Sequence, residues 1–142
     1  MVLAKDGSIA GRGRGRAERG QSLLELAILL PVLLLLLLGI LDVGRLYMTL
    51  VAINDAAAEG ASYAASYPTR TDQIQQRAAE SSTALTTIEP SMVVVTYVNP
   101  LSSGQPITVT VQYDYDLLTP VLSAIVPSGT LRVRGIDTRV IY

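Results

Sequence analysis

A glycine, a glutamine and a carboxylate at fixed spacing precede the apolar part of this sequence. Gly20 and Gln21 follow a basic leader, and Glu25 stands five residues after the glycine. No charged residue occurs from Leu26 to Leu41. Because an acidic side chain costs roughly 2.5–3.5 kcal/mol at the middle of a bilayer and less near its edge, we expect Glu25 to have a specific use.

Cleavage after Gly20 would give Glu25 a partner. The new amino terminus at Gln21 would be a cation at the end of an apolar helix, and Glu25 of a neighbouring helix could neutralise it. Pairing would relieve the desolvation cost of both groups and would fix the register of the two helices. The alternative is an interfacial Glu25 whose carboxylate reaches the cytoplasmic headgroups.

The residue types absent from the chain exclude most catalytic chemistry. The 142 residues include no Cys and no His, which removes disulfides, thiolate metal ligands and the commonest general base. A Ser-His-Asp triad is therefore impossible. We expect no enzymatic activity, no metal site and no cofactor. Asp114, Asp116 and Asp137 could offer oxygen ligands to Ca²⁺, but solvation of strand edges explains them better.

Leu23 to Val43 is predicted to be a transmembrane helix. These 21 residues would span about 31 Å at 1.5 Å per residue, which matches the apolar thickness of a bilayer. Pro31 removes one backbone hydrogen bond and predicts a modest kink. A secretory signal peptide cut at Ala56-Ala57-Ala58 is the alternative, but that site lies well beyond the apolar run.

Charge is distributed unevenly along the chain. Residues 1–20 carry five basic and two acidic side chains, whereas residues 21–142 carry six basic and ten acidic ones. This pattern predicts a cytoplasmic N-terminus and an extracytoplasmic C-terminal part. The Gly/Arg-rich leader is predicted to be disordered. Its tract at residues 11–16 could bind RNA or anionic lipid, but we favour an orientation signal accessible to a peptidase, and expect no nucleic-acid partner.

The helix is predicted to continue beyond the membrane to Tyr67, where Pro68 ends it. Asp42 and Arg45 are spaced to form an ion pair across one turn. Small residues recur at every fourth position and would let another element approach closely: Ala52, Ala56, Gly60 and Ala64. Two interpretations stay open, because this stripe could receive either a helix of another subunit or the protein's own C-terminal module.

Residues 68–142 are predicted to form a small extracytoplasmic module, so that the whole chain has an α+β fold. A short amphipathic helix over Thr69–Thr87 precedes three antiparallel strands. These strands are expected at Met92–Val98, Ile107–Asp114 and Leu131–Tyr142. Apolar residues of the last strand change parity at Gly135, which predicts a β-bulge there. The predicted organisation is a leader (1–20), a long transmembrane and extended helix (21–67) and this module (68–142).

The order of these features resembles the TadE-like family of pseudopilins, which are type IV pilin-like proteins. The stretch from Gly20 to Pro31 reads GQSLLELAILLP and has the Gly, Glu and Pro of the family in order. The Leu-rich run then ends in Asp42-Val43-Gly44-Arg45, which resembles the family's acidic residue and Gly-Arg pair. Leu26 stands where the family usually has an aromatic residue.

The resemblance implies a minor pseudopilin role in a tight-adherence (Tad/Flp) pilus. It implies cleavage between Gly20 and Gln21 by a prepilin peptidase, with Glu25 used in peptidase recognition and in subunit pairing. The implied partners are that peptidase, other pilin-like subunits, the membrane assembly platform and the lipid bilayer. The residues alone leave two alternatives, an uncleaved signal-anchored binding module and a secreted protein cut near Ala58.

Overall fold

The computed structural model describes residues 14–98, 100–119, 126 and 129–142. Its elements are, in chain order, α1 (Arg14–Ser66), α2 (Thr71–Glu80), η1 (Pro90–Met92), β1 (Val93–Tyr97), β2 (Pro106–Asp116) and β3 (Thr130–Val140). A long N-terminal apolar helix, a short helix and a three-stranded antiparallel sheet confirm the predicted α+β fold. The chain divides into two compact units, residues 1–37 and 38–142.

The first unit contains the beginning of α1. Its large apolar side chains from Leu23 to Leu37 are all exposed, with exposed fractions between 42% and 67%. A helix that is apolar on every side requires apolar surroundings. By its length and composition, the described helix could cross a membrane once. Pro31 lies inside α1, and the kink expected there stays a prediction.

The start of α1 differs from the predicted boundary at Gly20. Residues 1–13 lie outside the described residues, and the helix begins at Arg14, six residues before Gly20, while the predicted disorder of the leader stays a prediction. Arg, Ala and Glu fill most of residues 14–19, and they are good helix formers. The long apolar helix that follows also removes the need for a separate nucleation step.

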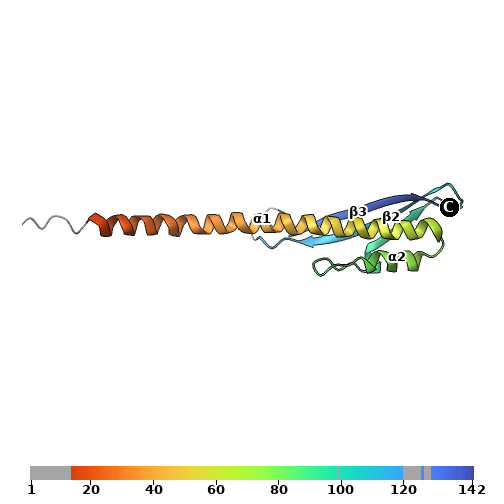
Figure 1. The fold of residues 1–142 in the computed structure, drawn as a ribbon, viewed down its shortest axis with the longest axis horizontal. Helices are drawn as coiled ribbons and strands as arrows, with labels where there is room; N and C mark the ends of the chain where they lie inside the picture. Colours follow the sequence, from red (N-terminus) through yellow and green to blue (C-terminus); the bar gives the residue numbers. More distant parts are fainter. Residues whose placement is uncertain (1–13, 99, 120–125, 127–128) are drawn as a thin grey trace, which may run out of the picture. The chain divides into compact units, whose positions relative to one another are not determined.

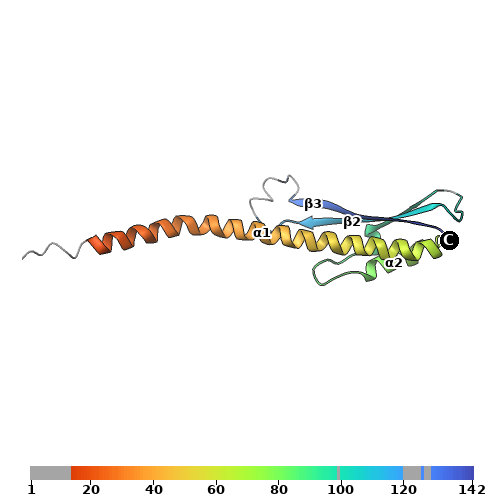
Figure 2. The same ribbon diagram turned by 45° about the horizontal axis from the view of Figure 1, so that its top comes forward.

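The second unit is built on a sheet with the strand order β1-β2-β3. β1 and β2 pair from Val93↔Val111 to Tyr97↔Ile107, and β2 and β3 pair from Pro106↔Val140 to Asp116↔Thr130. Figures 1 and 2 show the strands running alongside the later part of α1, with α2 beside the same part of the helix. All three predicted strands are present, with ends shifted by a few residues.

Regular pairing continues through Gly135, so the predicted β-bulge is wrong. Gly135 lies opposite Val111 in an unbroken register. A Cβ on Gly135 would lie 2.3 Å from the carbonyl oxygen of Ile53, so this position needs glycine because the backbone of α1 approaches it closely. The change in apolar parity along β3 has a different cause. Ile136 and Val140 are apolar but lie on the outer face of the sheet, where they are 59% and 53% exposed.

The small-residue stripe of α1 packs against the protein's own module. Gly60 shows how tight this packing is, because a Cβ there would lie 3.1 Å from Cγ1 of Val109 and 3.2 Å from Cβ of Ala78. The stripe joins side chains of α2 and of the inner sheet face in one core, whose fully buried members include Ile53, Ala56, Ala57, Ala61, Ala64, Ile74, Ile107, Val109 and Val111. Of the two predicted uses of the stripe, the structure shows the one within the chain.

α2 ends at Glu80, whereas the predicted helix continued to Thr87. The hydroxyl of Ser82 donates to the carbonyl of Ala79 (2.7 Å) and accepts from the N–H of Ile88 (2.8 Å). These bonds offer the backbone an alternative to further helical turns. Beyond the strands, the N–H of Tyr142 donates to the carbonyl of Ala65 (3.1 Å), which fastens the end of the chain to α1.

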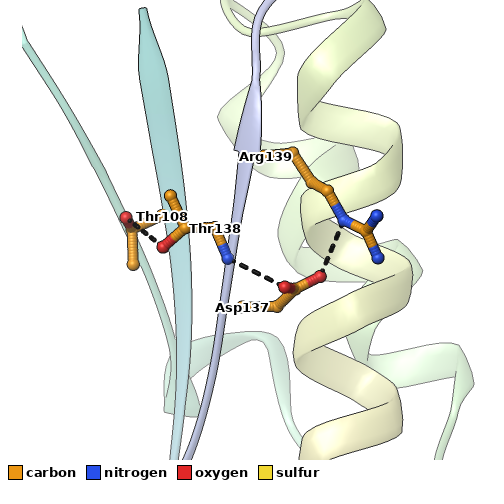
Figure 3. A network of polar contacts seen from close by, with 4 residues as sticks. All are labelled: Thr108, Asp137, Thr138 and Arg139. Carbon is orange, nitrogen blue, oxygen red and sulfur yellow. Dashed lines mark hydrogen bonds and ion pairs between the residues drawn. The ribbon is translucent and has the colours of Figure 1, made fainter.

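Polar side chains occupy the edge strand β3 (Figure 3). The hydroxyls of Thr108 and Thr138 lie 2.8 Å apart, and Asp137 accepts hydrogen bonds from the N–H of Thr138 and from Nε of Arg139, both at 2.9 Å. The charged side chains of Asp137 and Arg139, and the backbone N–H of Thr138 that is already bonded to Asp137, make this edge strand a poor template for another chain. This edge is therefore protected against non-specific strand pairing.

Candidate functional site

The predicted cleavage segment lies at the beginning of the exposed apolar helix. Nε2 of Gln21 donates to Oε1 of Glu25 at 3.2 Å, and both residues are exposed. A Cβ on Gly20 would meet no atom within 4 Å. The structure thus brings Gln21 and Glu25 together on one face of the helix, and the amide orients a carboxylate that could accept a cation.

The peptide bond between Gly20 and Gln21 is helical, because α1 begins at Arg14. A peptidase requires an exposed stretch of backbone, so cleavage would need local unwinding of the first turns. Glycine is a poor helix former, by about 1 kcal/mol relative to alanine, which makes Gly20 a favourable position for such unwinding.

A second polar site surrounds Asp42, within the second unit. Asp42 is 2% exposed, and its carboxylate accepts three hydrogen bonds from the segment after β2. The N–H of Thr119 donates at 2.8 Å, its hydroxyl at 2.5 Å, and the N–H of Leu118 at 3.2 Å. The hydroxyl of Tyr115 also donates to the carbonyl of Asp42 at 3.2 Å. A buried carboxylate with this many donors is well satisfied and holds the segment on the helix.

The ion pair predicted between Asp42 and Arg45 is not formed. The guanidinium of Arg45 instead lies 5.7 Å from the ring centroid of Tyr115, in cation–π geometry. Its Nη1 is buried and has no hydrogen-bond partner within the described part of the chain. Burial raises the pKa of Tyr115, so its hydroxyl keeps its proton and remains a donor well above neutral pH.

Two of the acidic residues of the sheet, Asp114 and Asp137, have different partners. Asp114 accepts from Nε of Arg132 at 2.7 Å, and this bond holds the pKa of the Asp114 carboxyl below its usual range. Asp137 is bonded to Arg139 instead. Among residues 14–98, 100–119, 126 and 129–142, no group of three acidic side chains is arranged to hold a metal ion.

Sequence reasoning singled out Gln21 and Glu25 but not the hydrogen bond between them, and it missed the partners of Asp42. Thr119 lies 77 positions from Asp42 in the sequence, and no periodicity links the two residues. One signal was present, because a charge that directly follows a long apolar run has to be neutralised or buried. That signal indicates that Asp42 has a partner but not which residue it is.

Comparison with protein families gives one match. Residues 20–62 match the family model described as TadE-like protein. This confirms the predicted family resemblance over most of the described helix, and it relates the protein to the Tad pilus and its components. Comparison with curated proteins and with solved structures gives no match.

Proposed function

We propose that this protein, with its TadE-like segment, is a minor pseudopilin of a Tad/Flp-type pilus. Its apolar helix anchors it in the membrane with the N-terminus in the cytoplasm and the module outside. A prepilin peptidase removes residues 1–20, and the mature chain assembles through its helix with other pilin-like subunits on the membrane platform. The role is structural and not enzymatic.

The observation that carries this proposal is the position of Glu25. Its carboxylate is exposed at the start of a helix whose large apolar side chains are uncovered as far as Leu37, and it lies within the matched segment. The small-residue stripe of the second unit is already used internally. The segment around Glu25 therefore offers an uncovered part of α1 to helices of other subunits.

One observation favours the alternative of an uncleaved anchor, namely the helical peptide bond after Gly20. The secreted form cut near Ala58 receives less support. Ala56 and Ala57 are fully buried in the core of the module, so cleavage beside them would remove the helix on which the sheet packs.

Replacing Gly20 by valine is expected to leave the leader attached. Because open space surrounds Gly20, Gly20→Val should fold and insert normally, and only recognition of the cleavage site should suffer. Intact-mass spectrometry of the membrane-bound protein should find a chain that begins at Gln21 for the wild type and at the original N-terminus for the variant. Gly39→Val is the matched control, since Gly39 also has open space around it. Unchanged processing of Gly20→Val would contradict the proposed cleavage.

Replacing Glu25 by alanine is expected to weaken assembly more than membrane insertion. Loss of one charge pair between helices should lower the co-purification of pilin-like subunits about tenfold, the factor that corresponds to about 1.4 kcal/mol. Glu59→Ala removes an exposed carboxylate from another part of α1 and should have no such effect. The fraction of cleaved chains is measured in the same samples, so that assembly is compared between mature proteins. Equal co-purification of both variants would refute the pairing.

A further inference from the structure

Exposed apolar side chains continue on α1 after Val43, the predicted end of the membrane segment. Tyr47, Met48 and Val51 have exposed fractions of 64%, 58% and 40%. Polar residues take over at the next exposed positions, Asn54 and Asp55. A helix that entered water at Val43 would expose polar side chains two turns earlier, so the apolar surface indicates a later boundary.

The segment after β2 adds another apolar side chain at the same end of the module. Leu118 is 61% exposed, and its N–H is bonded to Oδ1 of Asp42 at 3.2 Å. Because Asp42 precedes Tyr47 along α1, Leu118 lies nearer to the apolar run than Tyr47 does. Any apolar environment that surrounds Tyr47 therefore reaches Leu118 as well.

The two charged residues of this part of α1 contact the module, Asp42 buried and Arg45 half-buried. Asp42 is buried with its oxygens bonded to Leu118 and Thr119, and Arg45 places its guanidinium over the ring of Tyr115. From Leu38 to Val51, no charged side chain of α1 is classed as exposed. The module thus covers the carboxylate of Asp42 and part of Arg45, whose charges an apolar environment would oppose, while Asp116 beside Leu118 stays exposed and requires polar headgroups around it.

We propose that the base of the module is immersed in the lipid headgroup layer on its own side of the bilayer. Tyr47, Met48, Val51 and Leu118 form its apolar collar, and the membrane boundary lies near Val51. Glu25 to Val51 is 27 residues, and a bilayer with both headgroup regions, 40–45 Å thick, takes roughly 27–30 helical residues. Tyr47 has the amphipathic ring typical of this layer.

Charged residues show that the surroundings of the collar are headgroups and not hydrocarbon. Asp55 is exposed on α1 four residues after Val51. Asp114 and Arg132 form an exposed ion pair beside Tyr115, which a headgroup layer accommodates but a hydrocarbon layer opposes. Lipid is also the expected surrounding of the collar because Tyr47, Met48 and Val51 belong to the same helix as the candidate membrane span. The inference depends on the membrane span alone and stands without the pilus role.

Spin labels on single cysteines test the collar, since the chain has no native Cys. Full-length Leu118→Cys and Met48→Cys are labelled and reconstituted in phosphatidylcholine–phosphatidylglycerol vesicles. Both labels should be reached by oxygen and lose access to a water-soluble nickel chelate, as Leu36→Cys in the membrane segment should. Val94→Cys is the matched control, because Val94 is 45% exposed on the outer face of the sheet and should remain open to nickel.

Nickel access at Leu118→Cys and Met48→Cys equal to that at Val94→Cys would overturn the proposal. Labels that neither reagent reaches would also overturn it, since protein and not lipid would then cover the collar. A second variant uses the absence of native Trp. The emission of Leu118→Trp should shift to the blue when vesicles are added, and that of Val94→Trp should not. Purified protein suffices for both assays, so a failed peptidase or pilus experiment leaves their result unaffected.

Discussion

Replacing Gly135 by alanine is expected to destabilise the second unit by roughly 3 kcal/mol, at the upper end of the usual cost of overpacking. The new Cβ would lie 2.3 Å from the carbonyl oxygen of Ile53, 2.5 Å from its carbonyl carbon and 2.8 Å from the nitrogen of Asn54. All three are backbone atoms of α1, which no side-chain rotation can move. The helix and the sheet must therefore separate, and the loss should appear as a lower unfolding midpoint of the full-length protein in detergent.

Gly44→Ala is the control for this prediction. A Cβ on Gly44 would meet no atom within 4 Å, and alanine is the better helix former by about 1 kcal/mol. The unfolding midpoint should stay the same or rise slightly. Equal midpoints for Gly135→Ala and the wild type would mean that the helix and the sheet are less closely packed than the structure shows.

Replacing Asp42 by alanine is expected to release the segment after β2 and to cost on the order of 3 kcal/mol of stability. The substitution leaves three donors without an acceptor, and hydrogen bonds to a charged group contribute about 1.5–3 kcal/mol each before the donors find water. Amide hydrogen exchange of Leu118 and Thr119 should become fast, while the amides of β2 remain protected.

Asp55→Ala provides the comparison, because it removes an exposed carboxylate from the same helix. Its exchange pattern should match that of the wild type. Thr119→Val removes one of the three donors, the hydroxyl, and should produce a smaller loss than Asp42→Ala. Continued protection of Leu118 and Thr119 in Asp42→Ala would show that another contact holds this segment.

Local patterns predicted most of the elements, because each depends on nearby residues. Alternation from Ile107 onward predicted β2, and the Pro after Tyr67 predicted the end of α1, which the structure places at Ser66. The end of α2 was less predictable, since the hydroxyl of Ser82 competes with helical hydrogen bonds and its partner is Ile88. Propensity alone does not include that competition.

Gly135 shows why tertiary contacts limit prediction from sequence. A glycine inside a strand indicates either a bulge or the close approach of another backbone, and the apolar parity change favoured the bulge. The structure shows close approach, because the backbone of Ile53 lies against Gly135, and Ile53 belongs to a helix far away in the sequence. Gln21 and Glu25 are four positions apart, so they meet on one face of a helix, whereas Asp42 and Thr119 meet only through the fold.

The contacts at Asp42 and Ala65 have a mechanical consequence. Thr119, after β2, is bonded to Asp42 of α1, and Tyr142, after β3, is bonded to Ala65 of α1. The sheet therefore connects two points of the helix and spans the turns between them. A single helix under tension lengthens by breaking its hydrogen bonds turn by turn. Between these two fixed points that lengthening would also require the sheet contacts to break. Under load, extension should therefore begin in the residues before Asp42, and the module should keep its shape.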